Sequence, residues 1–61
     1  MTTEKELMIL ATYKVMLENK LILPYTAQDV RICFFHKYGH FPSALFIKDA
    51  LSTLDEVGLN G

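Results

Sequence analysis

The clearest alternation of apolar and polar positions lies between Ser43 and Leu59. Apolar residues recur there at steps of three and four, as on one face of an α-helix, and they are Ile47, Ala50, Leu51, Leu54 and Val57. Ser43 is a favourable N-cap, and Gly58 can adopt the positive φ that ends many helices. Leu59 can then fold back onto the last turn. The pattern predicts one amphipathic helix over residues 43–57.

The N-terminal stretch predicts a second helix, over residues 4–18. Thr3 and Glu6 have the spacing of a capping box, in which each side chain bonds the other residue's backbone. The apolar residues fall on two sides of this helix. One side has Ile9, Leu10, Tyr13, Met16 and Leu17, and the other has Met8, Ala11 and Val15. Polar residues separate the two sides, and they are Lys5, Thr12, Lys14 and Glu18.

Two apolar sides are more than a surface helix of a monomer needs. We therefore expect a homodimer through this helix, with Ile9, Tyr13 and Met16 at the interface. The alternative is that a three-helix core covers the helix from both sides. The short chain favours the dimer, because small domains often need oligomerisation for stability.

The middle of the chain predicts a connector and a third helical segment. Asn19 can end the first helix, and residues 21–23 before Pro24 should form a connector packed on the core. Thr26 and Asp29 favour a helix start, and Gly39 a stop, which gives a helix over 27–38. Its core-facing residues are Val30, Cys33, Phe34 and Tyr38. Phe41 should fill the corner before the last helix.

These elements predict an all-α domain of three helices spanning residues 1–61, with the last two in a helix-turn-helix arrangement. Residues 23–59 resemble the core of winged-helix regulators of the ferric-uptake-regulator type. The resemblance is carried by the second helix's Thr26-Ala27-Gln28-Asp29-Val30, by Gly39, and by Ser43, Ile47, Leu51, Leu54, Gly58 and Leu59. It implies a DNA-binding transcription regulator with the third helix in the major groove. The sequence departs from that pattern after Leu59, where only two residues follow, so we expect no complete wing.

Composition narrows the setting and the partners. The only cysteine is Cys33, so no internal disulfide can form, and a reducing, cytoplasmic setting is expected. The polar, acidic start of the chain is unlike a targeting peptide, and no apolar run approaches the about 18 residues of a membrane span. The net charge of −1 argues against a strong non-specific hold on nucleic acid.

Asp29, Cys33 and His36 are candidate metal ligands, because they share one helix face, with His40 just beyond it. Such donors can bind zinc, but the spacing matches no established zinc motif, and a core cysteine beside a solvated edge is the favoured interpretation. The two histidines could act as a pH switch or lie on the surface without a role. We expect no metal, no cofactor and no catalysis, because so small a domain has little room for a substrate pocket.

Two functions therefore compete. The first is a helix-turn-helix DNA-binding regulator. Its candidate contacts are Thr26, Gln28, Arg31, Lys37, Ser43, Lys48 and Ser52. The basic residues are scattered between acids, however, and capping alone explains Thr26 and Ser43. The second is an adaptor or inhibitor that binds a protein through Phe35, Leu45 and Phe46, which lie off the expected core faces. The alternative for these three residues is burial under the connector, residues 21–23. The organised pattern from Thr26 to Leu59 favours the DNA-binding regulator.

Overall fold

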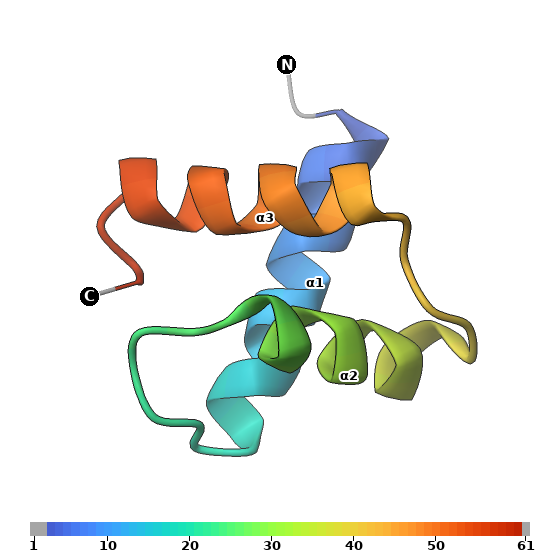
Figure 1. The fold of residues 1–61 in the computed structure, drawn as a ribbon, viewed down its shortest axis with the longest axis horizontal. Helices are drawn as coiled ribbons and strands as arrows, with labels where there is room; N and C mark the ends of the chain where they lie inside the picture. Colours follow the sequence, from blue (N-terminus) through green and yellow to red (C-terminus); the bar gives the residue numbers. More distant parts are fainter. Residues whose placement is uncertain (1–2, 61) are drawn as a thin grey trace.

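The computed structural model describes residues 3–60, which form three α-helices with no strand among them (Figure 1). The helices are α1 (Glu4–Glu18), α2 (Ala27–Tyr38) and α3 (Ala44–Glu56). The all-α class and the three helix ranges predicted from the sequence are confirmed, with Ser43 and Val57 as the caps of α3 rather than its ends. None of these helices is long and apolar enough to cross a lipid bilayer.

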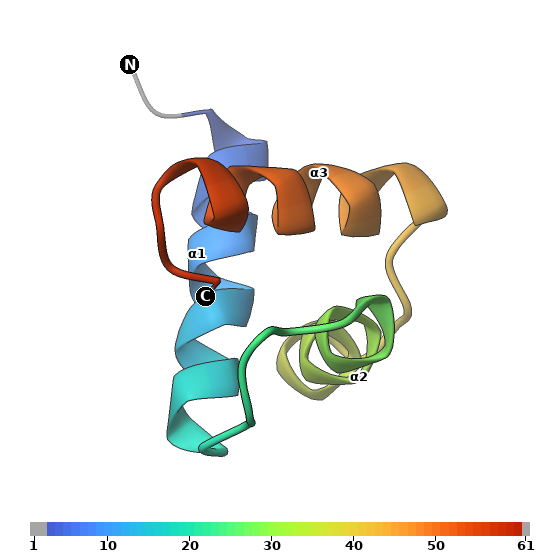
Figure 2. The same cartoon turned by 60° about the vertical axis from the view of Figure 1, so that its left-hand side comes forward.

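The helices α2 and α3 lie across α1 at two levels. In both ribbon views α3 crosses near the N-terminal half of α1, and α2 crosses near its C-terminal half (Figures 1 and 2). Figure 2 shows α2 nearly end-on while α3 runs across the picture, so these two helices cross rather than run parallel. The segment that joins them, residues 39–43, is only five residues long.

The core takes side chains from all three helices and from the segment before α2. Tyr25 is the contribution of that segment. The other buried apolar residues are Ile9, Met16, Val30, Cys33, Phe34, Ala50 and Leu54. Each comes from the apolar stripe of its own helix, spaced by three, four or seven residues, as a 3.6-residue period requires.

The buried stripe of α1 differs from the predicted one. It runs through Ile9, Thr12 and Met16, so Thr12 lies in the core, with 1% of its surface exposed, instead of separating two apolar sides. Its hydroxyl donates a 2.9 Å hydrogen bond to the carbonyl of Met8, which satisfies the polar group locally. The side of α1 that faces away from this stripe exposes three leucines, which are Leu7, Leu10 and Leu17.

Helix α1 stops where predicted, by a Schellman motif. The backbone N–H of Leu21 donates to the carbonyl of Met16 at 3.4 Å, and that of Lys20 donates to Leu17 at 3.0 Å. The left-handed residue is Lys20, with φ of 54°, whereas Asn19 keeps φ of −87°. After this stop only Leu21 packs against the core. Ile22 is 87% exposed, so the expectation that residues 21–23 pack on the core is wrong for most of the connector.

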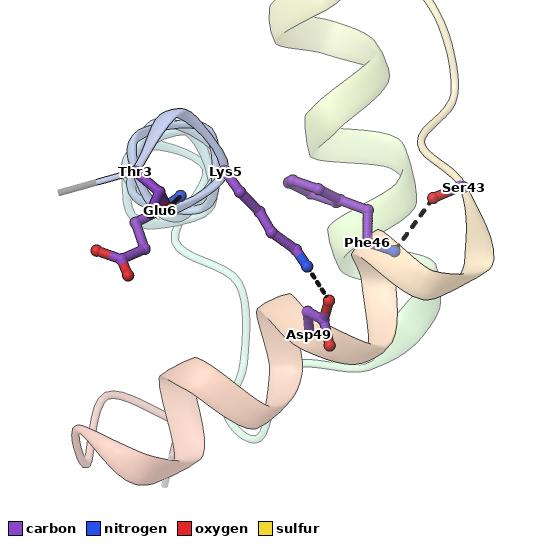
Figure 3. A network of polar contacts seen from close by, with 6 residues as sticks. All are labelled: Thr3, Lys5, Glu6, Ser43, Phe46 and Asp49. Atoms are coloured by element: carbon purple, nitrogen blue, oxygen red, sulfur yellow. Dashed lines mark hydrogen bonds and ion pairs between the residues drawn. The ribbon is translucent and has the colours of Figure 1, made fainter.

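Helix α2 has a complete capping box. The Thr26 hydroxyl accepts from the backbone N–H of Asp29 at 3.3 Å, and the Asp29 carboxylate accepts from that of Thr26 at 2.9 Å. Gly39, with φ of 79°, ends the helix as predicted. At α1 the Thr3 hydroxyl accepts from the backbone N–H of Glu6, which is one half of the predicted capping box. At α3 the Ser43 hydroxyl accepts from the backbone N–H of Phe46, as predicted for an N-cap (Figure 3).

The end of α3 returns the chain to the core. The N–H of Leu59 donates to the carbonyl of Leu54 at 2.9 Å and that of Gly58 donates to Asp55 at 3.2 Å, so the predicted Schellman stop is confirmed. Leu59 packs against the core, whereas Val57, predicted to face it, is exposed. Figure 2 shows the C-terminal segment turning back toward α1.

Two residue pairs far apart in the sequence make polar contacts within residues 3–60. The Asn60 side chain accepts from the backbone N–H of Tyr25 at 2.5 Å and donates to its carbonyl at 3.4 Å. At the other end of the molecule, Lys5 of α1 forms an ion pair with Asp49 of α3 (Figure 3). The first contact joins the C-terminal segment to the start of α2, and the second joins α1 to α3.

Candidate functional site

The exposed side of α2 carries a group of stacked side chains that the core does not use. Phe35 of α2 and Phe41 of the following turn are stacked, with ring centroids 4.5 Å apart and planes 25° apart. Phe35 is 44% exposed and Phe41 is 51% exposed. The expectation that Phe41 fills the corner before α3 is therefore wrong, because its ring lies on Phe35 and faces solvent.

A guanidinium group covers the same ring. The Cζ atom of Arg31 lies 4.4 Å from the centroid of Phe41, which is a cation–π distance. Arg31 and Phe35 are one helical turn apart, and the exposed Ile32 lies three residues before Phe35 on the same side of α2. We call Arg31, Ile32, Phe35 and Phe41 the aromatic platform.

A second aromatic group lies between α2 and α3 and belongs to the core. The Phe34 ring packs against Phe46 at 4.9 Å and against Tyr38 at 4.7 Å between centroids. His40 packs edge-on against Phe34 at 5.3 Å. Phe46 is only partly exposed, so part of its ring is taken up by the core and less of it is available to a partner than for Leu45. Its ring holds α3 against α2.

The outward side of α3 is poorly suited to phosphate. Leu45 is 65% exposed, as predicted, and Lys48 and Ser52 are exposed one turn apart. Lys48 is the only basic residue of α3, whereas the helix carries three acidic ones, Asp49, Asp55 and Glu56. Asp49 is engaged with Lys5, but Asp55 and Glu56 are exposed, so this side of the helix repels a polyanion.

The other candidate DNA contacts do not gather on α3. Thr26 and Ser43 cap α2 and α3 with their hydroxyls. Gln28 and Arg31 lie on the exposed side of α2, where the Arg31 Nη1 donates to the Gln28 Oε1 at 3.4 Å. Lys37 lies beside α1 in a groove. The structure thus divides the predicted set among several parts of the surface.

That groove lies between α1 and α2, is open, and has a volume of about 770 Å³. Leu7, Leu10 and Lys14 line it from α1, and His36 and Lys37 line it from α2. The predicted dimer contacts lie elsewhere. Ile9 and Met16 are buried in the core of the monomer, and Tyr13 is partly buried and packs edge-on against Tyr25. Ile9 and Met16 therefore offer no free surface to a second copy, and Tyr13 offers only part of its ring.

The candidate metal ligands Asp29, Cys33 and His36 line one small cavity of about 170 Å³. Burial, and secondly the negative charge of Asp29, raise the pKa of the Cys33 thiol. Within residues 3–60 no three His, Cys, Asp or Glu side chains are placed to hold a metal ion. A thiol with a raised pKa stays protonated at neutral pH, so Cys33 is a poor nucleophile and a poor metal ligand.

Comparisons of this chain with protein-family models, curated proteins and solved structures find no match. The resemblance to winged-helix regulators therefore stays a prediction. The most organised exposed feature of the described surface is the aromatic platform.

Proposed function

We propose that this chain is a protein-interaction module that binds its partner through the aromatic platform. The observation that carries the proposal is the stacked, half-exposed pair Phe35 and Phe41 with Arg31 over the ring. Aromatic residues and arginine are the types enriched at interface hot spots. An aromatic ring buries much apolar surface with few rotatable bonds, and a guanidinium supplies several donors in a planar fork. Ile32 adds a further exposed apolar side chain three residues before Phe35 on α2.

A DNA-binding regulator of helix-turn-helix type remains the second candidate. It is favoured by the short segment between α2 and α3 and by the exposed Lys48 and Ser52 on one side of α3. Against it stand the acidic residues of α3 and the net charge of −1, because DNA affinity depends on phosphate neutralisation. Binding to a protein does not require a positively charged surface of this kind.

The experiment is a selection of binding peptides followed by affinity measurements. A phage library of random 12-residue peptides is selected on the immobilised chain, and the selected peptides are titrated by fluorescence anisotropy against wild type, Phe41→Ala and Ile22→Ala. Ile22 is the matched control, because it is exposed and apolar but lies outside the platform. We expect Phe41→Ala to weaken binding about tenfold or more, as for a hot spot, and Ile22→Ala to leave it unchanged.

A selection without binders, or binders that ignore Phe41→Ala, would refute the proposal. In parallel, duplex DNA is titrated at two salt concentrations with wild type and Lys48→Ala. Affinity that falls with a log–log slope near about −0.9 per phosphate contact, and that drops further in Lys48→Ala, would favour the regulator instead.

We also propose that the expected homodimer uses the outward side of α1. Leu7, Leu10, Lys14 and Leu17 are spaced by three, four and three residues, which is the a/d spacing of a helix–helix seam. Sedimentation equilibrium at micromolar concentration tests this with Leu10→Glu, which leaves the core intact, and Ile22→Glu as control. Dimers of wild type and Ile22→Glu but monomers of Leu10→Glu are expected. A monomeric wild type, or a dimeric Leu10→Glu, would remove the idea.

The proposed setting of the module is the cytoplasm. Cys33, the only cysteine in the sequence, is a buried free thiol, so the fold draws no stability from oxidation.

A further inference from the structure

We infer that Arg31 receives a carboxylate of the partner, so that the bound segment is an acidic one, with Asp or Glu next to apolar side chains. This inference rests on the proposed function and names the chemistry of the partner. It depends on how Arg31 is held, on what surrounds it, and on what happens to its charge when the platform is covered.

Arg31 is held in place before any partner arrives. Its guanidinium lies over Phe41 at 4.4 Å, and its Nη1 donates to the Gln28 Oε1 at 3.4 Å. An arginine side chain normally loses much rotamer freedom when it forms a directed bond, and the stack on Phe41 limits that freedom in advance, whereas the long bond to Gln28 adds little. A guanidinium has five N–H donors, so one bond to Gln28 leaves most of them for a partner. Their fork geometry matches a carboxylate.

The charge of Arg31 is not neutralised inside the molecule. Within residues 3–60 the side-chain ion pair joins Lys5 of α1 to Asp49 of α3, so it does not involve Arg31. Asp29, the only acid of α2, bonds the backbone N–H of Thr26 in the capping box. The other three residues of the platform are uncharged. Arg31 is therefore the single charge among the four residues of the platform.

Covering the platform makes this charge decisive. A partner that buries Phe41 also removes water from the guanidinium stacked on it. Burying a charge without a compensating partner is costly, so a purely apolar or a basic segment binds badly. Phosphate recognition in proteins uses clusters of arginine, whereas the platform has one. A carboxylate flanked by apolar side chains satisfies both the charge and the rings.

The test extends the peptide selection to matched pairs of proteins and peptides. Selected 12-residue peptides are measured by fluorescence anisotropy with each Glu or Asp kept, changed to the amide, or replaced by phosphoserine. The proteins are wild type, Arg31→Gln, Arg31→Lys and, as a control of the same charge change away from the platform, Lys48→Gln. Arg31 and Lys48 are exposed, and circular dichroism verifies that each variant is folded.

We expect wild type to select peptides rich in acids next to Leu, Ile or Phe. Arg31→Gln and the loss of one peptide carboxylate should each weaken binding about tenfold, and together hardly more than either alone, since they remove the same contact. Arg31→Lys should also weaken binding, because an ammonium lacks the fork. Lys48→Gln should leave affinity unchanged.

Three results would overturn the inference, namely selected peptides without acids, losses that add independently, or tighter binding of phosphoserine than of Glu. The outcome also separates this inference from the proposed function. Peptides that lose affinity with Phe41→Ala but not with Arg31→Gln leave the module in place and remove the carboxylate. Peptides insensitive to both substitutions remove both.

Discussion

Asn60 offers the sharpest test of how this small fold holds together. Its side chain bonds the backbone of Tyr25 on both sides, accepting from the N–H at 2.5 Å and donating to the carbonyl at 3.4 Å. The two residues are 35 positions apart, so this contact ties the end of the chain to the entry of α2. The perturbation is Asn60→Ala, which removes both bonds and adds no bulk.

The expected cost follows from the burial of Tyr25, which is part of the core. A hydrogen bond between neutral groups contributes about 0.5–1.5 kcal/mol net, and a buried donor left unpaired costs about 1–3 kcal/mol. The bond at 3.4 Å is long and contributes little, so the short bond sets the magnitude. We expect Asn60→Ala to lower the free energy of unfolding by about 1–3 kcal/mol. For 61 residues the whole stability is of the order of 3–9 kcal/mol.

Urea unfolding followed by far-UV circular dichroism measures this change. Asn19→Ala is the matched control, because the Asn19 side chain bonds the Val15 carbonyl at 2.7 Å but within one exposed helix end. It should cost less than about 1 kcal/mol, since water can replace that partner. Asn60→Asp should fall between wild type and Asn60→Ala, because it keeps the acceptor and loses the donor. Equal midpoints for wild type and Asn60→Ala would refute the reasoning.

Three further substitutions or reactions probe single features. Lys20→Gly should raise the free energy of unfolding by about 0.5–1 kcal/mol in the same urea assay, since glycine adopts the left-handed φ of 54° without strain; an unchanged or lower midpoint would contradict this. Gly58→Ala should lower it by about 1 kcal/mol, because φ there is 76° and only the backbone angle, not a clash, opposes a Cβ. Burial and the charge of Asp29 raise the pKa of the Cys33 thiol, so iodoacetamide at about pH 8 should alkylate the folded chain about tenfold more slowly than the urea-unfolded chain. The free energy of unfolding should also fall as the pH rises past about 8.5, the pKa of an unfolded thiol, and should fall less steeply in Cys33→Ala. Equal alkylation rates of the folded and the urea-unfolded chain would show that the thiol is not protected.

The helix boundaries could be predicted because their signals are local. Thr26 and Ser43 each cap a helix by accepting from the backbone N–H three residues later. Gly39 and Gly58 have the positive φ angles that the helix stops require. Such motifs need only neighbouring residues, so a linear pattern contains the whole interaction. The apolar periodicity of α2 is local in the same way, and Cys33 is buried as predicted.

The faces of α1 could not be predicted in the same way. Thr12 looked like a polar boundary, but its hydroxyl bonds the Met8 carbonyl inside its own helix and so can be buried at low cost. With Thr12 in the core, the stripe centres on Ile9 and Met16, and the leucines turn outward. The buried face of α1 is therefore turned relative to the predicted one, and two of the three expected dimer contacts, Ile9 and Met16, lie in the core.

The aromatic residues show where the sequence was ambiguous for the candidate site. Phe41 and Phe46 flank the start of α3 and are chemically identical, yet Phe46 packs on Phe34 and Phe41 stacks on Phe35 in solvent. The conformation of residues 39–43 makes that choice, and neither capping nor periodicity determines it. A signal was present nonetheless, because Arg31 and Phe35 are four residues apart and so share one side of α2. A domain that keeps a ring pair in water, with an arginine over it, retains a surface that its own packing does not require, and that surface is the reason to look for a partner there.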